Sequence, residues 1–598
     1  MCGILGTTDK TISERQMELA LKEIFKRGPD NQALIKNESV YFGHTRLSIL
    51  DLDQRSNQPF SYKHGDRNIL MTFNGEIYNY IVIKEKLLQK GYEFHTNSDT
   101  EVVCAAYCEY GLNCFDYFEG MWAVAINEGV NIILSRDRLG KKPLYYSHLK
   151  NQQLFFGSSL KSVSILSSNN KLSTEGIELY FALGFIPKNF SVIENISKIE
   201  PGSVFHFELK EQGCELTIQR KSVFRTQTTL DRRSVKKIIQ DSVEKRLLSD
   251  VPVTTLMSGG IDSTIVTSIL NKIKPNTEAY FVDFDDKKLS ERKWADYLAQ
   301  KNDIKLKRFL MPSDELKTAF IDYYSVYEEP FADYSGIPSI AIFKEVSKKY
   351  KVVLTGDGGD ELFYGYPHYF KKLVLYTFFN VLKPFRNTNF LSKSIKTILN
   401  GNKKEFESNY LKNHGVLTSF ASSFINKNFN ESISKSGSFA KGIIEYDRDF
   451  YNWPEKYLVK VDRSSMFSGV EVRSPFMDEN LIRKVKKIPT FFLFTPYSSK
   501  LFLKVLFFKI FGLKYFTATK KGFTPPIKEL RKLNFVEKDF LELKQFLNNV
   551  SPNTYEQIKN VGYSDLKNDK ILFDRFFFFN EWRNKLYDNF TKKNQKNA

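Results

Sequence analysis

Residues 253–263 read VTTLMSGGIDS and decide the fold of the larger part of the chain. An apolar strand pattern over residues 253–257 runs directly into a glycine turn, and a helical pattern follows over residues 263–273. Glycines let the backbone turn tightly, and the helix presents its first N–H groups and the positive end of its dipole. The segment predicts a phosphate-binding loop, although it matches neither the Walker A nor the GxGxxG pattern. An ordinary glycine turn is the alternative interpretation.

The same alternation continues downstream of this loop. Strand patterns lie at 279–284, 305–311 and 351–354, and helical patterns lie at 290–302 and 335–349. Strands that alternate with helices of this length favour a parallel, doubly wound sheet. Residues 370–598 are mostly helical in pattern. We therefore predict an α/β domain with helical additions.

The first third of the chain has a different pattern. Short strands are expected at 40–42, 69–73, 122–126 and 132–135, and helices at 80–90 and 101–110. Short strands, turns and few helices indicate an α+β unit with antiparallel sheets. A polar stretch follows it. We therefore predict a first domain over residues 1–212, a linker over residues 213–229 and a second domain over residues 230–598.

The overall composition is that of a globular protein. Hydrophobic residues make up 42% and charged residues 26% of the 598 residues, which excludes wholesale disorder. The net charge is +19, and the excess lies beyond residue 220. Such an excess indicates either a polyanionic ligand or a lysine-rich solvated surface. The basic residues are scattered, which favours the surface, and we expect no nucleic acid partner.

Cysteine usage and apolar runs give the expected compartment. Five cysteines in 598 residues do not make a disulfide scaffold. The first residues, MCGILG, lack the basic and apolar regions of a secretion signal, and no run of about 20 apolar residues occurs. The apolar stretch 491–516 is interrupted by lysines and indicates a buried helix more than a peripheral membrane contact. We expect a cytoplasmic protein without stable membrane insertion.

Three cysteines, Cys104, Cys108 and Cys114, lie close together in the sequence. Cys104 and Cys108 share one helical face, which would suit a metal ligand pair. No matching His or Cys pair lies nearby, and free cysteines are commonly buried. Core packing is therefore the expected role.

Cys2 is a candidate nucleophile. Removal of Met1 would give this residue a free α-amino group with a pKa of about 8 beside a thiol of about 8.5. The amine then acts as the base that activates the thiol, so one residue carries both functions. An incidental small residue at position 2 is the alternative interpretation.

Three later positions suit the chemistry of acyl transfer. Arg46 offers a guanidinium to a carboxylate, and Asp99 offers either a partner for an ammonium or a cap for the following helix. The Asn74 side chain and the Gly75 N–H suit a developing oxyanion. Taken singly, each position is more often structural.

In order, these motifs resemble the class II glutamine amidotransferase domain. The motifs are MCGI at 1–4, RGPD at 27–30, RLSI at 46–49, NGE at 74–76, SD at 98–99, RDRLG at 136–140 and KPLY at 142–145. The resemblance implies an Ntn-hydrolase α-β-β-α sandwich in which glutamine is hydrolysed through a thioester on Cys2. It implies an oxyanion hole at Asn74 and Gly75, and a glutamine site of Arg46, Leu47, Ser48, Ile49, Leu50, Asn74, Gly75, Glu76 and Asp99.

One motif departs from the family pattern. The segment GSSLK at residues 157–161 lacks the acidic residue that relatives usually carry there. The departure puts a local contact between the domains in doubt and leaves the chemistry untouched.

A second glycine-rich loop, TGDGGDELF, occupies residues 355–363 after the expected strand at 351–354. Carboxylates on a turn at the carboxyl end of a strand suit Mg²⁺, which prefers carboxylate and phosphate oxygens. A capped turn is the alternative interpretation. The first loop, with Ser258, Asp262 and Ser263, resembles the pyrophosphate loop of ATP pyrophosphatases.

Both loops and three later motifs together resemble the synthetase domain of glutamine-hydrolysing asparagine synthetases. The later motifs are YLVKVDRSSM at 457–466, EVRSPFMD at 471–478 and KKGF at 520–523. The resemblance implies an ATP and pyrophosphate site of Met257, Ser258, Gly259, Gly260, Asp262, Ser263, Val282, Thr355 and Gly356. It implies Mg²⁺ at Asp262 and Asp360, and catalytic roles for Asp357 and Lys520. Asp357 stands where many relatives carry Glu.

The expected activity is that of an asparagine synthetase, with glutamine as nitrogen donor and ATP and Mg²⁺ as cofactors. An amidotransferase of the same fold that acts on another carboxylate, such as a uronic acid of a surface polysaccharide precursor, is the alternative. A catalytically silent, basic scaffold or nucleic-acid binder is a third hypothesis, and the intact site residues argue against it. The expected partners are glutamine, aspartate or another carboxylate, and ATP, and a homodimer is compatible with the sequence.

Overall fold

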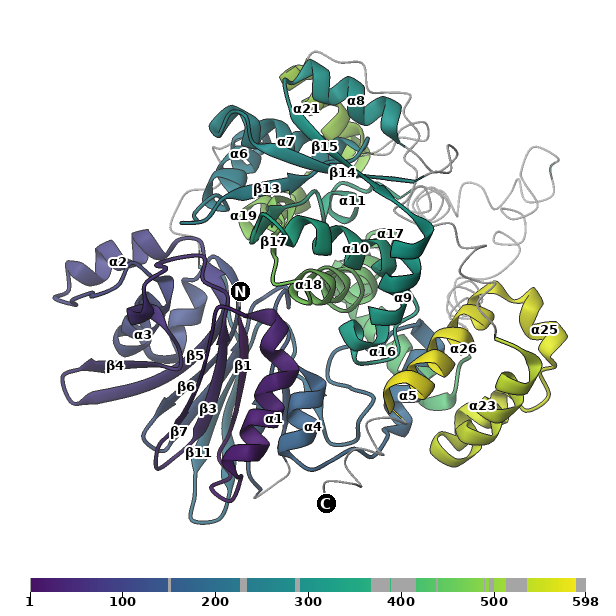
Figure 1. Ribbon diagram of the computed structural model, residues 1–598, viewed down its shortest axis with the longest axis horizontal. Coiled ribbons are helices and arrows are strands. Elements are labelled where there is room, and N and C mark those ends of the chain that lie inside the picture. Colours follow the sequence, from purple (N-terminus) through teal and green to yellow (C-terminus); the bar gives the residue numbers. More distant parts are fainter. Residues whose placement is uncertain are drawn as a thin grey trace.

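The computed structural model describes residues 2–148, 152–225, 234–284, 291–366, 388, 416–436, 439–488, 490–493, 500–511 and 535–587. Figure 1 shows the sheets of the first domain at the lower left and the second domain above and to the right of them. The chain begins where the two domains meet.

The first domain contains two six-stranded antiparallel sheets within the described residues. One sheet has the order β10-β8-β9-β1-β3-β2 and the other β12-β11-β7-β6-β5-β4. Their bounds are β1 Gly3–Thr7, β2 Asn31–Lys36, β3 Tyr41–Arg46, β4 Phe60–His64, β5 Arg67–Ile77, β6 Gly120–Glu128, β7 Asn131–Arg136, β8 Tyr145–Ser147, β9 Phe155–Gly157, β10 Ser197–Lys198, β11 Ser203–Leu209 and β12 Cys214–Lys221.

Helices cover the outer faces of both sheets. Helices α1 (Glu14–Ile24) and α4 (Leu160–Leu166) pack on the first sheet, and α2 (Tyr80–Leu88) and α3 (Asp99–Tyr110) pack on the second. Apolar side chains of both sheets form the core between them. Strand β6 has a helix layer on one side and a sheet on the other, which explains why it is buried along nearly its whole length. The expected α-β-β-α sandwich is confirmed.

Strand β12 occupies the first part of the predicted linker. It lies inside residues 213–229 and pairs with β11 from Lys221 back to Cys214, at the edge of the second sheet. An edge strand pairs on one side only, and most residues of β12 are exposed or half-buried and polar. The polar composition of residues 214–221 therefore belongs to a strand.

The second domain contains a five-stranded parallel sheet within the described residues, in the order β15-β14-β13-β16-β17. The strands are β13 Val253–Leu256, β14 Glu278–Phe284, β15 Lys305–Met311, β16 Val352–Leu354 and β17 Glu471–Arg473. The order reverses between β13 and β16. Ligands of doubly wound sheets bind at such a switch point, beyond the carboxyl ends of the strands.

Helices surround this sheet, as predicted. They include α6 (Val235–Lys245), α7 (Ile261–Ile273), α8 (Arg292–Lys301), α9 (Ser313–Tyr327), α10 (Gly336–Ser347) and α18 (Leu458–Met466). Apolar side chains of α6 and α7 pack together with those of β13 and β16 in one core cluster. Helix α18 lies between the parallel sheet and the first domain (Figure 1).

A helical region completes the second domain. It contains α16 (Ser419–Ser436), α17 (Phe439–Tyr446), α21 (Leu501–Phe511), α23 (Glu537–Val550), α24 (Pro552–Ile558), α25 (Tyr563–Asn568) and α26 (Lys570–Trp582). Helix α5 (Thr174–Leu183), although part of the first domain in sequence, packs among these helices (Figure 1). The two domains therefore share a hydrophobic core.

Cys104 and Cys114 are fully buried in the core beneath α3, and all five cysteines are free. Core packing is confirmed for these two, while Cys108 is half-buried. No group of three or more His, Cys, Asp or Glu side chains in the described part of the chain is placed to hold a metal ion. Within the same part, none of the helices has the length and apolarity needed to cross a membrane.

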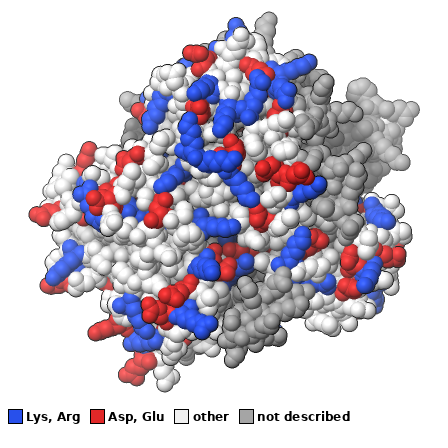
Figure 2. Space-filling view, in the orientation of Figure 1, with Lys and Arg blue, Asp and Glu red and all other residues white. Residues whose placement is uncertain are grey.

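The basic excess is partly neutralised on the surface. Figure 2 shows Lys and Arg side chains over the upper part of one face with acidic side chains among them. Glu278 pairs with Lys305 and Lys349, and Glu345 pairs with Lys307 and Lys348. These pairs support the interpretation as a solvated surface.

Candidate active sites

Cys2 lies immediately before β1 and is almost fully buried, with 8% of its surface exposed. Its backbone N–H donates to Asn74 Oδ1 at 3.0 Å, and its carbonyl accepts from Arg27 Nε at 3.2 Å. Burial raises the pKa of the Cys2 thiol, and the nearby Leu47 N–H and Arg46 guanidinium act in the opposite direction. The N-terminal end of the chain, just before β1, lies where the two domains meet (Figure 1).

Asn74 and Gly75 lie beside Cys2 on β5. The Asn74 Nδ2 atom is buried and has no hydrogen-bond partner among the described residues. A Cβ at position 75 would lie 2.2 Å from the Met121 carbonyl oxygen, so β6 approaches too closely for any residue except glycine. A buried donor without a partner is costly unless a ligand supplies the acceptor. This pair can therefore stabilise an oxyanion formed at Cys2.

The loop after β3 holds the Arg46 guanidinium in place. Arg46 donates to the carbonyls of Leu50, Asp51 and Asp53 and to Asn57 Oδ1, with 2.7 Å to the last. The loop carries Leu47, Ser48 and Ile49, which were predicted with it. Of the predicted residues 47–50, Leu50 contacts this cation through its carbonyl, while Leu47 and Ile49 are buried in an apolar cluster.

Asp99 starts α3, but it does not cap the helix. The cap is Ser98, whose hydroxyl accepts from the Thr100 N–H at 3.2 Å. Asp99 Oδ2 instead accepts from the Ile77 N–H at 2.9 Å, which fixes the carboxyl to the end of β5. Burial raises the pKa of Asp99 to about 6, helped by the Glu471 carboxylate. Its helix-cap alternative is therefore wrong.

Glu76, the third residue of NGE, contacts the second domain. Its Oε2 accepts from Arg473 on β17 at 3.1 Å, and both side chains are buried. Burial raises the pKa of Glu76 well above its usual range, and the Arg473 guanidinium opposes this. Arg473 also donates to Glu471 and to the Arg246 and Leu248 carbonyls. The sequence marked the motif around Arg473 without indicating this contact.

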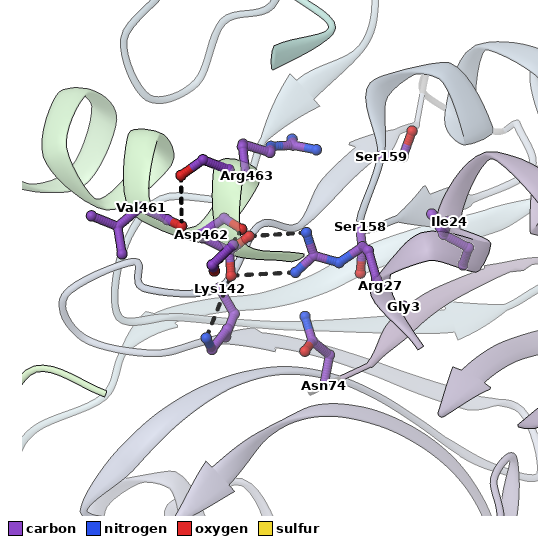
Figure 3. A network of polar contacts seen from close by, with 12 residues as sticks. Gly3, Ile24, Arg27, Asn74, Lys142, Ser158, Ser159, Val461, Asp462 and Arg463 are labelled. Atoms are coloured by element: carbon purple, nitrogen blue, oxygen red, sulfur yellow. Dashed lines mark hydrogen bonds and ion pairs between the residues drawn. The ribbon is translucent and has the colours of Figure 1, made fainter. Parts of the chain in front are cut away.

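Arg27 makes a second buried contact between the domains, drawn in Figure 3. Its two terminal nitrogens donate to both carboxylate oxygens of Asp462 on α18, at 2.9 and 3.3 Å. Lys142 approaches the same carboxylate at 3.4 Å. Arg27 and Asp462 each belong to a motif that the sequence marked, but their pairing depends on the packing of the domains.

The departure at residues 157–161 does not remove the interdomain contact. Ser159 Oγ donates to Glu328 Oε1, and the Leu160 N–H donates to Glu328 Oε2, both at 2.8 Å. The acidic group of this contact therefore comes from the second domain.

Two serine hydroxyls hold the glycine loop after β13 in a tight turn. Ser263 Oγ accepts from the Ser258 N–H at 2.9 Å, and Ser258 Oγ accepts from the Gly260 N–H at 3.0 Å. Helix α7 begins at Ile261, so its first turn opens at this loop. Met257 precedes the loop, and Val282 lies on the neighbouring β14. The expected strand–turn–helix is confirmed here.

The second glycine loop packs directly against the first. A Cβ at Gly356 would lie 2.6 Å from the Ser263 nitrogen, and one at Gly359 would lie 2.5 Å from Asp262 Oδ1. Thr355 donates to Asp357 Oδ2 at 2.7 Å and shares a 3.2 Å hydroxyl contact with Ser474. The two loops follow β13 and β16, the strands that flank the switch point. Lys520 lies outside the described residues.

Lys500 joins the two predicted magnesium ligands. Its ammonium contacts Asp262 Oδ2 and lies 2.7 Å from Asp360 Oδ1. Lys500 is buried and has φ 53°, a left-handed conformation that is uncommon for lysine. Two carboxylates held around one cation have the donor chemistry that Mg²⁺ requires. The sequence around Lys500 contains no motif that relates it to the loops, so this lysine was not predicted.

Two family profiles match the chain. The profile described as a glutamine amidotransferase domain matches residues 1–218, and the profile described as asparagine synthase matches residues 234–549. Asparagine synthetase [glutamine-hydrolyzing] 1 of Bacillus subtilis is 30% identical over 520 residues, which cover 82% of this chain and 81% of that protein. The putative asparagine synthetase [glutamine-hydrolyzing] 2 of Methanocaldococcus jannaschii is 30% identical over 517 residues, 78% of this chain and 98% of that protein.

These matches span both sites described above. The first profile includes Cys2, Asn74 and Asp99, and the second includes both glycine loops and Lys500. The chain belongs to the family of glutamine-hydrolysing asparagine synthetases.

Proposed function

We propose that the protein converts aspartate, glutamine and ATP into asparagine, glutamate, AMP and pyrophosphate. One observation carries the proposal: a buried thiol beside an unpartnered amide donor lies in the same chain as a pair of apposed glycine loops at a switch point. The first feature suits amide hydrolysis, and the second suits a nucleotide.

In the proposed glutamine half-reaction, the Cys2 thiolate attacks the side-chain carbonyl carbon of glutamine. The Asn74 amide and the Gly75 N–H take the oxyanion, and the freed α-amino group of Cys2 moves the proton to the departing ammonia. Water then attacks the thioester and releases glutamate. Asp99 suits the α-ammonium of the substrate. Arg46 would attract the α-carboxylate by its charge and its Nε–H, because its terminal N–H groups are held by the loop.

In the proposed synthetase half-reaction, the aspartate β-carboxylate attacks the α-phosphorus of ATP and pyrophosphate leaves. Ammonia attacks the acyl carbon, and AMP leaves. The N–H groups of the loop at Ser258–Ser263 suit the phosphate oxygens. Asp262 and Asp360 would hold Mg²⁺, which offsets phosphate charge when bound. We assign Asp357 and Lys520 to formation of the acyl adenylate and expect Met257, Val282, Thr355 and Gly356 to line the nucleotide site.

The compartment and the assembly are also proposals. Five free cysteines fit the reducing cytoplasm, where disulfides are rare. A homodimer is compatible with the sequence and is tested by sedimentation of the full chain.

The test of the proposed function separates the two half-reactions. Cys2→Ala removes the proposed nucleophile, so glutamine hydrolysis and glutamine-dependent synthesis should vanish, while synthesis from added ammonia should remain. Aspartate, but not succinate, should stimulate ATP–pyrophosphate exchange, because a site built for the α-ammonium is left unpaired by succinate. Products of ADP and orthophosphate in the wild type would overturn the adenylation, and exchange that requires a uronic acid nucleotide would replace the acceptor.

A further inference from the structure

The ion pair between Arg27 and Asp462 connects the second domain to the proposed nucleophile, Cys2. Arg27 donates through Nε to the Cys2 carbonyl and through both terminal nitrogens to Asp462. Figure 3 shows the guanidinium directed at the Asp462 carboxylate, with Lys142 reaching the same group. A single arginine therefore spans from the backbone of Cys2 to helix α18.

This contact is buried and charged. Arg27 and Asp462 each expose 6% of their surface, and Lys142 exposes 2%. Burial would raise the pKa of Asp462, but Arg27 and Lys142 outweigh it and hold this pKa below its usual range. A bidentate guanidinium–carboxylate pair fixes direction as well as distance. A shift of α18 would therefore also shift the Arg27 guanidinium.

The same stretch of chain makes a second contact with the first domain. Four residues separate α18 from β17, and β17 ends at Arg473, which donates to Glu76 beside the oxyanion donors. The Arg473 carbonyl accepts from the Thr355 N–H at 3.0 Å, at the start of the second glycine loop. The Ser474 hydroxyl lies 3.2 Å from the Thr355 hydroxyl. Residues 458–474 therefore touch both proposed sites.

We propose that residues 458–473, through Asp462 and Arg473, position the nucleophile and the oxyanion donors of the glutamine site and couple them to the nucleotide loop. The proposal rests on the proposed function, because it requires Cys2 to be the glutamine nucleophile. Asp462 is a positioning residue that acts through Arg27, and Arg473 is one that acts through Glu76. The glutamine site is complete only when the second domain is docked.

The physical consequence is a change in rate more than in binding. Among the described residues, Asp462 makes no hydrogen bond or ion pair with Arg46 or Asp99, the groups assigned to the α-carboxylate and α-ammonium of glutamine. Arg473 acts on Asp99 through its charge alone. A shift of about 1 Å in a reacting group costs on the order of 10²-fold in rate. Occupation of the nucleotide loop should act through Thr355 and Arg473 on the same geometry.

The experiment uses the full chain and the isosteric change Asp462→Asn. We expect kcat for glutamine hydrolysis to fall by about 10-fold to 10²-fold with little change in KM. Synthesis from ammonia should be unchanged, because Asp462 touches neither glycine loop. We also expect ATP and aspartate to stimulate glutamine hydrolysis in the wild type but not in Asp462→Asn.

Glu479→Gln is the matched control. Glu479 pairs with Arg138 across the domains at 2.6 Å with similar burial, but neither side chain touches Cys2, Asn74 or Glu76. Arg27→Lys breaks the same link from the other end and also removes the bond to the Cys2 carbonyl, so the double variant Arg27→Lys/Asp462→Asn should be no worse than Arg27→Lys alone. This non-additivity distinguishes a shared link from two separate losses of stability.

The outcomes separate the inference from the proposed function. If the wild type does not hydrolyse glutamine, the proposed function is wrong. If the wild type hydrolyses glutamine and Asp462→Asn matches Glu479→Gln in kcat, the positioning role is wrong. Additive losses in the double variant, or an equal loss of ammonia-dependent synthesis, would also overturn it.

Discussion

At the scale of single residues, Asp99 makes the glutamine site sensitive to pH. Burial raises its pKa to about 6, so the group becomes neutral as pH falls through that value. A neutral carboxyl no longer pairs with the substrate ammonium. We expect KM for glutamine to rise between about pH 7 and pH 5, measured at each pH beside ammonia-dependent synthesis as control. Asp99→Asn should give a high KM that no longer varies with pH.

The raised pKa of Asp99 also changes how the stability of the protein depends on pH. The folded Asp99 holds its proton to a higher pH than the unfolded one, so this group lowers the free energy of unfolding as pH rises from about 4 to about 6. Asp99→Asn should therefore raise the melting temperature of the empty protein at neutral pH. For the first of these two predictions, a KM for glutamine that stays constant between about pH 7 and pH 5 would contradict the assignment of Asp99 to the substrate ammonium.

Lys500 predicts how the empty nucleotide site treats metals. Its ammonium already neutralises Asp262 and Asp360, so a divalent ion should bind weakly before nucleotide arrives. Lys500→Met removes this charge, and we expect Mn²⁺ affinity without nucleotide to rise at least about tenfold. Calorimetry or the spin-resonance signal of free Mn²⁺ measures this.

Lys500→Arg is the control for that measurement, because it keeps the positive charge and should leave Mn²⁺ binding weak. ATP–pyrophosphate exchange should fall in Lys500→Met, since a cation is lost beside the phosphates. Equal Mn²⁺ affinity in the wild type and Lys500→Met would show that the lysine does not occupy the metal position.

At the scale of elements, the two glycine loops must touch. A Cβ at position 356 would lie 2.6 Å from the Ser263 nitrogen, so Gly356→Ala should push the loop after β16 away from α7. We expect ATP–pyrophosphate exchange to fall by about 10²-fold while glutamine hydrolysis remains. Gly157→Ala is the control, because its Cβ would meet nothing closer than 3.4 Å. Normal exchange in Gly356→Ala would show that the loops need not meet.

Elements are also the scale at which the sequence is most informative. The strand before Ser258, the turn and α7 follow from residues that are adjacent in sequence, so local pattern suffices to predict them. The contact of Arg473 with Glu76 joins residues 397 positions apart and depends on β17 taking the edge of the sheet. Strand order is set by packing, and the local pattern does not contain it. The position of Lys500 between Asp262 and Asp360 likewise depends on packing.

At the scale of the whole molecule, the predicted boundary between the domains does not divide the core. Residues 1–212 were predicted as one domain, yet α5 within them packs against α26. The Phe181 ring lies 4.9 Å from the Phe576 ring and 5.1 Å from the Phe579 ring, and Tyr180 donates to the Arg575 carbonyl at 2.8 Å. An apolar helix predicts burial but not which domain covers it.

This shared core predicts that the first domain is not stable alone. A fragment of residues 1–225 would expose Tyr180 and Phe181 of α5, whose rings contact α26 in the full chain, and exposed apolar patches of this kind promote aggregation. We expect the fragment to aggregate or to bind a hydrophobic dye, and the full chain to melt without a separate transition of the first domain. In the full chain, Phe181→Ala should cost about 3–5 kcal/mol.

A fragment that also carries Tyr180→Lys and Phe181→Glu tests the cause of that instability. If the exposed face of α5 drives aggregation, these two changes should restore solubility. Glutamine hydrolysis should still stay low, because the soluble fragment lacks Asp462 and Arg473. A monomeric, fully active fragment of residues 1–225 would show instead that the glutamine site needs neither the shared core nor the second domain, since both contacts would be absent while Cys2 worked normally.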